Sequence, residues 1–262
     1  GRNMIEYFVE NASSYGGEID WLFDLITYMV GFWFLLTFGA MVYLLLKFRY
    51  REGVPAKYIT GERHNEKRWI HWPHNIIIVF DVVLIAGAIW VWVLVKQTMP
   101  PKDDAIRVIA QQWSWSFIHS GPDGKLDTED DIKTVNDLHV EVNKVYHFEL
   151  QSRDVIHNFA VPAFRLRQDM IPGRSIAGWF EPTLPGTYDI QCAEMCGHGH
   201  GIMSAAVTVH TPESYQQTMA AIRDGTYESD YLRRLNGPPT PIPGTVKASD
   251  PDSYATLLAK SF

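Results

Sequence analysis

The stretch QCAEMCGHGHGIMSA (residues 191–205) contains the only two cysteines of the chain. Cys192 and Cys196 lie four positions apart, and His200 and Met203 follow them closely. Three kinds of site fit such a cluster: a disulfide loop, a structural zinc site or a copper site. A disulfide suits an oxidising compartment, and structural zinc prefers four thiolate or imidazole ligands. A thioether beside thiolate and imidazole groups favours copper.

Two long apolar segments precede the cysteine cluster. Residues 25–46 carry no charge, and residues 76–95 carry a single charge, Asp81. Each segment is long enough to cross a bilayer, which takes about 20 apolar residues, and neither shows the polar face of a soluble core helix. The loop 47–75 between them carries seven basic and three acidic residues. The positive-inside rule therefore predicts that this loop is cytoplasmic and that both chain ends lie on the other side.

The chain downstream of the second span is acidic. From residue 99 onward it has 14 Lys and Arg against 21 Asp and Glu, which accounts for the whole net charge of −7. This balance argues against nucleic acid and for a cationic partner. We expect four parts: an extracytoplasmic N-terminal segment (1–20), a transmembrane hairpin (21–98), an all-β domain (99–211) and a C-terminal extension (212–262).

Short β-branched and aromatic runs separated by Pro-Gly and Asn-Lys turns predict an antiparallel sandwich. The acidic stretch 120–131 lacks the ligand spacing of an EF-hand, so we expect a solvated hairpin there. After residue 211 we expect a short helix, a proline-rich linker (237–244) and a last helix (253–262). The seven predicted strands are 106–117, 137–143, 146–152, 157–162, 175–182, 186–192 and 204–210.

The residue types in the cysteine cluster indicate more than one copper ion. A mononuclear blue-copper site uses one cysteine, two histidines and a weak axial methionine, so it has no use for a second thiolate. Two thiolates on one loop can each bridge two copper ions, and one further histidine is then needed. His157 stands at the start of a predicted strand in an apolar setting. Alone it would more often be a core residue, but with the cluster behind it we expect a ligand.

The cluster CAEMCGHGHGIM (192–203) resembles the CuA motif of subunit II of the haem–copper cytochrome c oxidases. The segments DVIHNFAVPAF (154–164) and QWSWSF (112–117) are similar to that subunit's upstream ligand segment and its aromatic cluster. The resemblance implies a two-helix transmembrane hairpin followed by an all-β cupredoxin-like Greek-key sandwich. It implies a dinuclear copper centre whose ligands are His157, Cys192, the Glu194 carbonyl, Cys196, His200 and Met203.

The resemblance also implies a function. A subunit of this family accepts electrons from cytochrome c, or from a c-type cytochrome domain, and passes them through the dinuclear copper centre to the haems of subunit I. There O2 is reduced to water, coupled to proton translocation, in a complex with further oxidase subunits. The implied location is the bacterial inner (plasma) membrane, as a multi-pass protein with the copper domain on the periplasmic face.

Family roles fall on individual residues. Trp113 matches the aromatic residue that receives the electron, Asp154 matches a docking carboxylate, and the Glu194 side chain matches a ligand of a magnesium ion shared with subunit I. From the charge we also expect Asp130 and Asp131 to help dock a basic donor. Trp113 and Trp115 are expected on one strand with their rings on the same side.

Two departures from the family pattern stand out. Ser114 replaces the usual Tyr between the two tryptophans. Asp81 lies near the place of a Glu that the family associates with a proton-channel mouth, without the W-T-x-x-P that follows it there. An acid inside an apolar span is a functional candidate, so we expect Asp81 to lie at the entry of a proton channel.

Two other functions remain open from the sequence. One is the copper subunit of a nitric oxide reductase, which uses the same kind of copper domain. This sequence does not exclude it, because the catalytic subunit is a different chain. A membrane-tethered copper electron carrier is the other, although one span would suffice as a tether.

Overall fold

A computed structural model of the chain describes residues 3–55, 59–229 and 231–232. The fold divides into two units, one formed by residues 21–97 and the other by residues 1–20 together with 98–262. Each is considered by itself. The predicted proline-rich linker (237–244) and the predicted last helix (253–262) lie outside the described residues.

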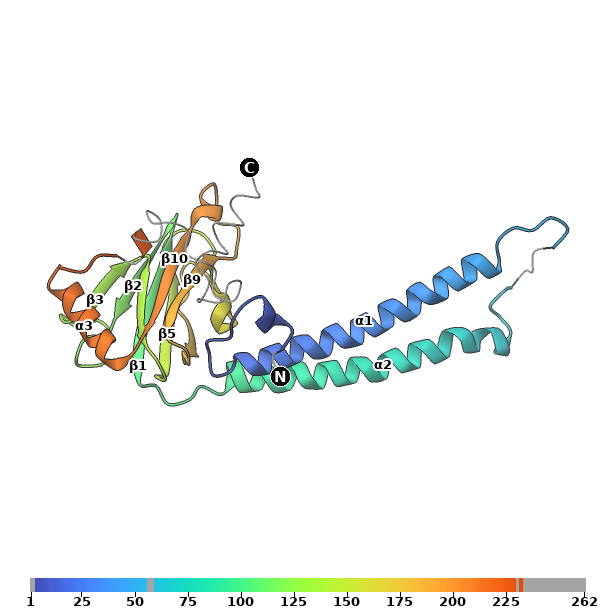
Figure 1. Ribbon diagram of the computed structural model, residues 1–262, viewed down its shortest axis with the longest axis horizontal. Coiled ribbons are helices and arrows are strands. Elements are labelled where there is room, and N and C mark those ends of the chain that lie inside the picture. Colours follow the sequence, from blue (N-terminus) through green and yellow to red (C-terminus); the bar gives the residue numbers. More distant parts are fainter. Residues whose placement is uncertain (1–2, 56–58, 230, 233–262) are drawn as a thin grey trace, which may run out of the picture. The chain divides into compact units, whose positions relative to one another are not determined.

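The first unit is a helical hairpin of α1 (Gly16–Lys47) and α2 (His64–Trp92). The first residues of α1 belong to the other unit, and the π-helical turn η2 (Val93–Gln97) follows α2. The two helices run side by side (Figure 1), with Trp21 against Trp90 at 5.7 Å between ring centroids and Trp33 against Phe80 at 5.5 Å. Both are long and apolar enough to cross a membrane, with mean hydropathies of 2.1 and 2.7. The first predicted span lies within α1, and the second runs from α2 into η2. Most of their apolar side chains are exposed within the unit, as contact with lipid or partner helices requires.

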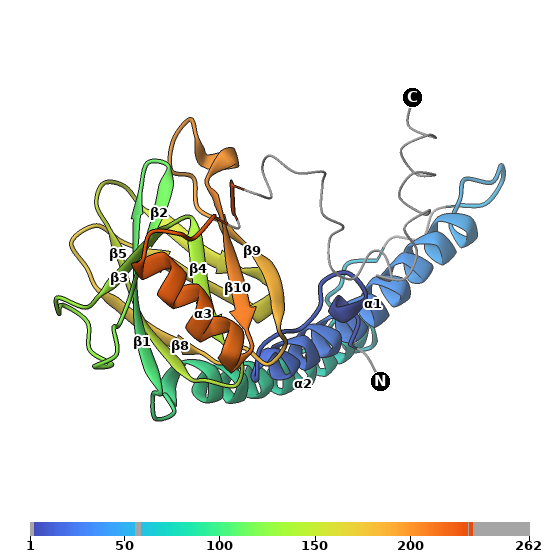
Figure 2. The ribbon, with the colours of Figure 1, turned by 60° about the vertical axis from the view of Figure 1, so that its left-hand side comes forward.

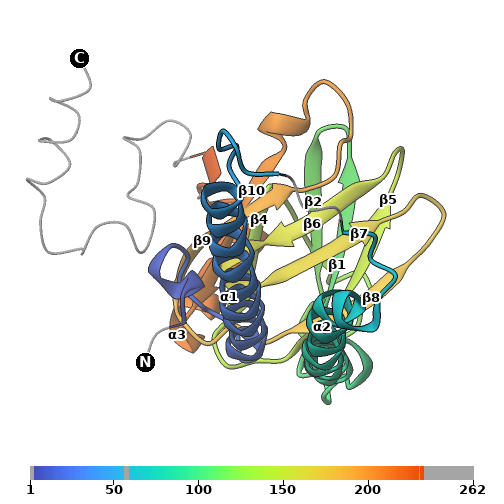
Figure 3. The same cartoon turned by 90° about the vertical axis from the view of Figure 1, so that its right-hand side faces the viewer.

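The second unit is a sandwich of two five-stranded sheets (Figures 2 and 3). The first sheet has the order β3-β2-β1-β5-β8 and the second β4-β10-β9-β6-β7. Each sheet contains one parallel pair, β1 with β5 and β4 with β10, and the other neighbours are antiparallel. The strands are β1 (Asp104–Gln111), β2 (Ser114–His119), β3 (Ile132–Val135), β4 (Asp137–Glu141), β5 (Tyr146–Ser152), β6 (His157–Val161), β7 (Leu166–Met170), β8 (Ile176–Phe180), β9 (Gly186–Cys192) and β10 (Ser204–His210).

Aromatic side chains fill the space between the sheets. Along β2 buried and half-buried residues alternate, so Trp115 and Phe117 face inward. Their rings meet Phe159 of β6, at 5.7 Å and 6.4 Å between centroids. Each such aromatic side chain buries a large apolar area, and edge-to-face pairs add about 0.5–1.5 kcal/mol. This packing fixes the position of β6, which begins at His157.

Two segments outside the sheets belong to the same unit. Residues 9–20 join the sandwich through the Ala12 amide, which donates to the Ala163 carbonyl (2.8 Å), and through a bridge between Ser13 and Pro182. The helix α3 (Pro212–Arg223) is capped by Thr211, whose hydroxyl accepts the Ser214 amide. It packs its Tyr215 and Met219 against Ile132.

The predicted strand 106–117 was wrong in one respect. The chain turns at Gln112 and Trp113, so that β1 and β2 form an antiparallel hairpin with Gln111 opposite Ser114. The β-branched and aromatic run hid the turn because it contains no glycine, proline or asparagine. Trp113 therefore lies in the turn and is 39% exposed, while Trp115 lies in β2 and is fully buried. The expectation that the two rings share one face of a single strand is also wrong.

Candidate metal centre

The residues of the cysteine cluster meet His157 because three strands are neighbours. The second sheet has the order β10-β9-β6 in this region, and Phe159 of β6 lies opposite Cys192 at the end of β9. His157 starts β6, and Met203 comes immediately before β10. The connection 193–203 between β9 and β10, here called the ligand loop, carries the remaining candidates.

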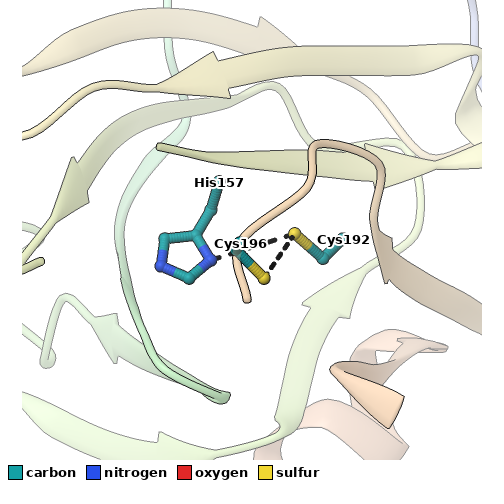
Figure 4. A group of neighbouring side chains, drawn as sticks. All are labelled: His157, Cys192 and Cys196. Carbon is teal, nitrogen blue, oxygen red and sulfur yellow. Dashed lines mark hydrogen bonds between the residues drawn. The ribbon is translucent and has the colours of Figure 1, made fainter. Parts of the chain in front are cut away.

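The two thiols lie at the middle of the site. Their Sγ atoms are 3.7 Å apart, far longer than the bond of about 2.05 Å in a disulfide, and both cysteines are free. The Cys192 Sγ lies 3.8 Å from His157 Nδ1 and 3.3 Å from the Glu194 carbonyl oxygen. Figure 4 shows His157 and the two cysteines pointing toward one another. Their ligand atoms all lie within 4.8 Å of one another.

The Cys196 thiol has its own pair of neighbours. His200 Nδ1 lies 3.7 Å from its Sγ atom, and the Met203 thioether sulfur lies 3.8 Å away. Each thiol is thus flanked by one imidazole nitrogen and one further donor. Cys196 and Met203 are each 2% exposed and His157 is fully buried. The sulfur atoms and His157 are therefore shielded from water, whereas His200 is half-buried.

This donor set fits a soft cation. Metal–sulfur bonds are about 2.3 Å long, so two sulfurs 3.7 Å apart can both contact one ion. Burial, followed by the neighbouring Cys192 thiol, raises the pKa of Cys196 to about 12. Two thiolates therefore require a positive charge in the pocket. A thioether together with imidazoles and thiolates favours copper.

A hydrogen-bond chain supports His157 from behind. Its Nε2 atom lies 2.8 Å from Asp154 Oδ1, which leaves Nδ1 directed at Cys192. The other carboxylate oxygen, Oδ2, accepts the Gln112 amide at 2.6 Å. A carboxylate on the far nitrogen of a metal-binding histidine fixes the ring and its tautomer. Asp154 is therefore placed to orient a ligand, and its side chain remains 31% exposed.

Trp113 covers the ligand loop. Its indole Nε1 donates to the Cys196 carbonyl at 3.1 Å. A Cβ atom on Gly199 would lie 2.4 Å from the ring, and one on Gly197 would lie 3.2 Å from it. The ring therefore rests on the two glycines that flank His198, with its other face accessible.

The remaining predicted residues are scattered. Asp130 and Asp131 precede β3, whose Ile132 pairs with His119 at the far end of β2 from Trp113, so the structure does not bring them to the metal centre. The Glu194 side chain is exposed and only its carbonyl faces the thiols. Asp81 lies on the exposed side of α2 within the helical unit.

Sequence reasoning missed Gln112 and the two glycines of the ligand loop. Gln112 Nε2 donates to the Cys196 carbonyl at 2.9 Å, beside the Trp113 indole. Gly197 has φ +112°, which side-chain-bearing residues rarely adopt, and Gly199 leaves room for the Trp113 ring. The G-x-G spacing around His198 was a usable signal for a close approach of another group. Nothing in the sequence singled out Gln112.

Fold and site define a class: a cupredoxin-like domain with a buried His–Cys–Cys group suited to a metal ion, joined to two helices that can span a membrane. The family profile described as cytochrome c oxidase subunit II, periplasmic domain, matches residues 105–210. The chain is 31% identical over 222 residues to the alternative cytochrome c oxidase subunit 2 of Bradyrhizobium diazoefficiens, covering 76% of this chain and 78% of that protein. The chain belongs to the cytochrome c oxidase subunit II family.

Other relatives agree. Subunit 2 of the Cereibacter sphaeroides oxidase is 29% identical over 254 residues, which cover 84% of this chain and 81% of that protein. The crystal structure of the periplasmic domain of subunit II of cytochrome oxidase (CoxB) of Bradyrhizobium japonicum is 28% identical, with a TM-score of 0.44, covering 50% of this chain and all of that one. Membership in the subunit II family makes the chain a subunit of an oxidase complex and a partner of subunit I, and its two apolar helices and matched domain make it a membrane protein with a periplasmic domain.

Proposed function

We propose that this chain receives electrons from cytochrome c, or from a c-type cytochrome domain, and passes them to the haems of subunit I, where O2 is reduced to water and protons are translocated. One observation carries the proposal: two buried thiols 3.7 Å apart, each flanked by an imidazole nitrogen and a further donor. The proposed ligands of a dinuclear copper centre are His157, Cys192, the Glu194 carbonyl, Cys196, His200 and Met203.

When bound, a dinuclear copper centre would supply reversible one-electron transfer. The protein holds its ligands in a buried pocket, which limits solvent reorganisation and tunes the reduction potential. Asp154 orients His157, and the ligand loop provides both thiolates from one short connection. The proposed donors converge on the two thiols, which suits the binding of metal ions. Electron transfer, and not bond chemistry, is what this arrangement supports.

Trp113 is the proposed point at which electrons arrive. Trp113 is 39% exposed, and its indole Nε1 donates a hydrogen bond to the Cys196 carbonyl. Met195 (73% exposed) and Ile202 (78% exposed) belong to the ligand loop, which Trp113 covers, and they add apolar surface. A donor that docks here brings its cofactor edge within reach of a ring that already contacts the ligand loop. Asp154, beside this surface, is the proposed docking charge.

The finer assignments extend the proposal. The exposed Glu194 carboxylate is proposed to ligate a magnesium ion shared with subunit I, and Asp81 to serve proton uptake from the helical unit. The chain is proposed to cross the bacterial inner membrane twice, with the acidic domain in the periplasm. Asp130 and Asp131 stay a prediction for donor docking, tested by the salt dependence of the association rate after their neutralisation.

Electron paramagnetic resonance tests the metal assignment directly. The oxidised full-length chain is expected to bind two copper ions and to show a seven-line hyperfine pattern from one electron shared by both. Replacing Cys196 by Ser is expected to reduce the pattern to four lines or to abolish binding. A four-line signal in the parent, or one copper per chain, would contradict the dinuclear centre.

Stopped-flow reduction tests the role of Trp113. Its replacement by Ala is expected to slow electron arrival at copper at least about tenfold, because tunnelling rates fall steeply with distance. Reduction as fast as in the parent would mean that electrons arrive by another route.

A further inference from the structure

Gln112 connects two halves of the metal centre that come from different places in the chain. It lies in the turn between β1 and β2 of the first sheet, whereas the ligands come from strands of the second sheet and from the ligand loop. Its main-chain amide donates to Asp154 Oδ2 at 2.6 Å, and its side-chain Nε2 donates to the Cys196 carbonyl at 2.9 Å. One residue therefore bonds to both sides of the centre.

The first hydrogen bond leads to His157. Asp154 accepts Gln112 N–H with one carboxylate oxygen and faces His157 Nε2 with the other, 2.8 Å away. The preceding residue is also held, because the Arg153 amide donates to the Ala110 carbonyl at 3.0 Å. The β1–β2 turn therefore fixes the carboxylate that sets the direction of the imidazole.

The second hydrogen bond leads to the thiolates. The Cys196 carbonyl accepts from Gln112 Nε2 and from Trp113 Nε1, so both acceptor positions of this oxygen are filled. The next residue, Gly197, has φ +112°, and its carbonyl accepts the His200 amide at 3.1 Å, so the Cys196 carbonyl lies directly before the turn that leads to His200. A Cβ on Gly197 would lie 3.0 Å from Gln112 Nε2, which shows how closely the amide is seated on the loop.

The position of Gln112 in a turn does not by itself explain its contact with the Cys196 carbonyl. A turn residue needs only its main chain, and a largely exposed glutamine would ordinarily keep its amide in water. The neighbouring Gln111 illustrates the difference, since its side-chain Oε1 accepts from Arg153 Nη1 at 3.0 Å, away from the ligand loop. Gln112 instead directs its amide at the carbonyl of a ligand residue.

We propose that Gln112 is a positioning residue of the metal centre. It couples the orientation of His157, through Asp154, to the main-chain position of Cys196, and so holds the two thiolates and the imidazole in one arrangement in both oxidation states. The inference rests on the proposed copper function. It adds to that function a residue that touches no metal and keeps the ligand geometry constant.

The test uses the full-length chain in detergent, loaded with copper. Gln112→Leu removes the side-chain donor, and Gln111→Leu is the matched control next to it. Loss of a partner behind a ligand typically costs about 10–100-fold in metal affinity. We therefore expect Gln112→Leu to lose copper to bathocuproine disulfonate at least about tenfold faster than the parent and to alter the copper hyperfine pattern, while Gln111→Leu matches the parent.

A double-mutant comparison separates positioning from general stability. Trp113→Phe removes the other donor to the same carbonyl. Because the two donors share one acceptor, the double variant is expected to lose copper faster than the product of the two single effects predicts. If the Leu variant does not fold, Gln112→Asn, whose amide is one methylene too short to reach the carbonyl, provides the same measurement.

The outcomes are distinct. A parent chain that lacks the seven-line pattern contradicts the proposed function itself. A parent that shows the pattern, together with a Gln112→Leu or Gln112→Asn variant that keeps the parent's hyperfine pattern and copper loss rate, overturns the positioning role. A loss rate changed equally by Gln111→Leu also overturns it.

Discussion

Asp154 shows how one carboxylate can serve a metal ligand and a surface at once. Partial burial alone would raise its pKa, but the hydrogen bonds from the Gln112 amide and His157 outweigh burial, so the pKa of Asp154 lies below its usual value. The group is therefore charged throughout the neutral range. A permanent negative charge behind His157 makes the imidazole a better donor to a metal, and the 31% of the side chain that remains exposed leaves it available to a docking partner.

Asp154→Asn is expected to weaken copper binding about 10–100-fold, because the amide keeps the shape but removes the charge behind the ligand. Copper affinity, measured by competition with a chelator, checks this. Asp130→Asn/Asp131→Asn is the control, since it removes more charge far from the centre and should leave affinity unchanged. Equal affinity in Asp154→Asn and the parent would restrict Asp154 to docking.

The buried His119 should make the free energy of unfolding depend on pH, whether or not a metal is bound. It is 1% exposed and its Nδ1 atom has no hydrogen-bond partner among the described residues. Burial, with a smaller contribution from His139, lowers the pKa of His119 to about 3. In the unfolded chain the pKa is about 6.5, so between these values the unfolded chain binds a proton that the folded chain does not.

The free energy of unfolding is therefore expected to decrease as the pH falls from about 6.5 toward 3, by at most about 1.4 kcal/mol per pH unit from this group. The contribution is fully present above the unfolded pKa. Chemical denaturation of the sandwich at several pH values measures the slope. His119→Phe should flatten it, whereas the exposed His198→Gln should not. An unchanged slope in His119→Phe would assign the acid sensitivity to other groups.

At the level of elements, sequence patterns predicted the helices and strands that depend on local chemistry. The two long apolar segments identified α1 and α2, and the strand at His157 and the cluster after β9 lie where the patterns placed them. The turn at Gln112 was missed because its conformation is set by contacts with Asp154 and Cys196, which lie 42 and 84 residues away. Such long-range contacts leave no local pattern.

The ligand loop offers a matched pair of glycines. A Cβ on Gly199 would lie 2.4 Å from the Trp113 ring, whereas a Cβ on Gly201 would meet no atom within 4 Å. Gly199→Ala is therefore expected to displace the ring, change its fluorescence and slow reduction by the donor, while Gly201→Ala behaves like the parent. Similar reduction rates in the two variants would show that the ring's position does not control electron arrival.

At the scale of the molecule, the N-terminal segment is part of the sandwich unit even though about 80 residues of helical hairpin separate it from β1. Arg165 explains this association. Its backbone adopts φ +53°, an uncommon conformation for a residue with a side chain. All five N–H groups of its guanidinium donate: to both Asp20 oxygens, to the Val9 and Glu10 carbonyls, and to the Pro162 carbonyl. No local pattern could predict such a contact between positions 145 residues apart.

Breaking this ion pair is expected to destabilise the sandwich unit strongly. The Asp20 side chain is fully buried and that of Arg165 is 6% exposed, so Arg165→Met leaves an unpaired buried carboxylate and should cost about 3–5 kcal/mol. Removing both charges in Arg165→Met/Asp20→Leu should recover most of that loss, since an apolar pair of similar size is often as stable as a buried ion pair. Denaturant unfolding of the full-length chain, followed by tryptophan fluorescence, measures both changes.

The ion pair of Arg107 with Asp127 provides the comparison, because the Asp127 side chain is 70% exposed. Asp127→Asn should have a much smaller effect on the free energy of unfolding, because exposed ion pairs contribute little to stability. Proteolysis adds a second measurement: in Arg165→Met the segment 9–20 should be cleaved faster than in the parent, and in Asp127→Asn it should not. If Arg165→Met is as mild as Asp127→Asn in both measurements, the segment is held by its main-chain contacts at Ala12 and Ser13, and the buried pair contributes specificity without net stability.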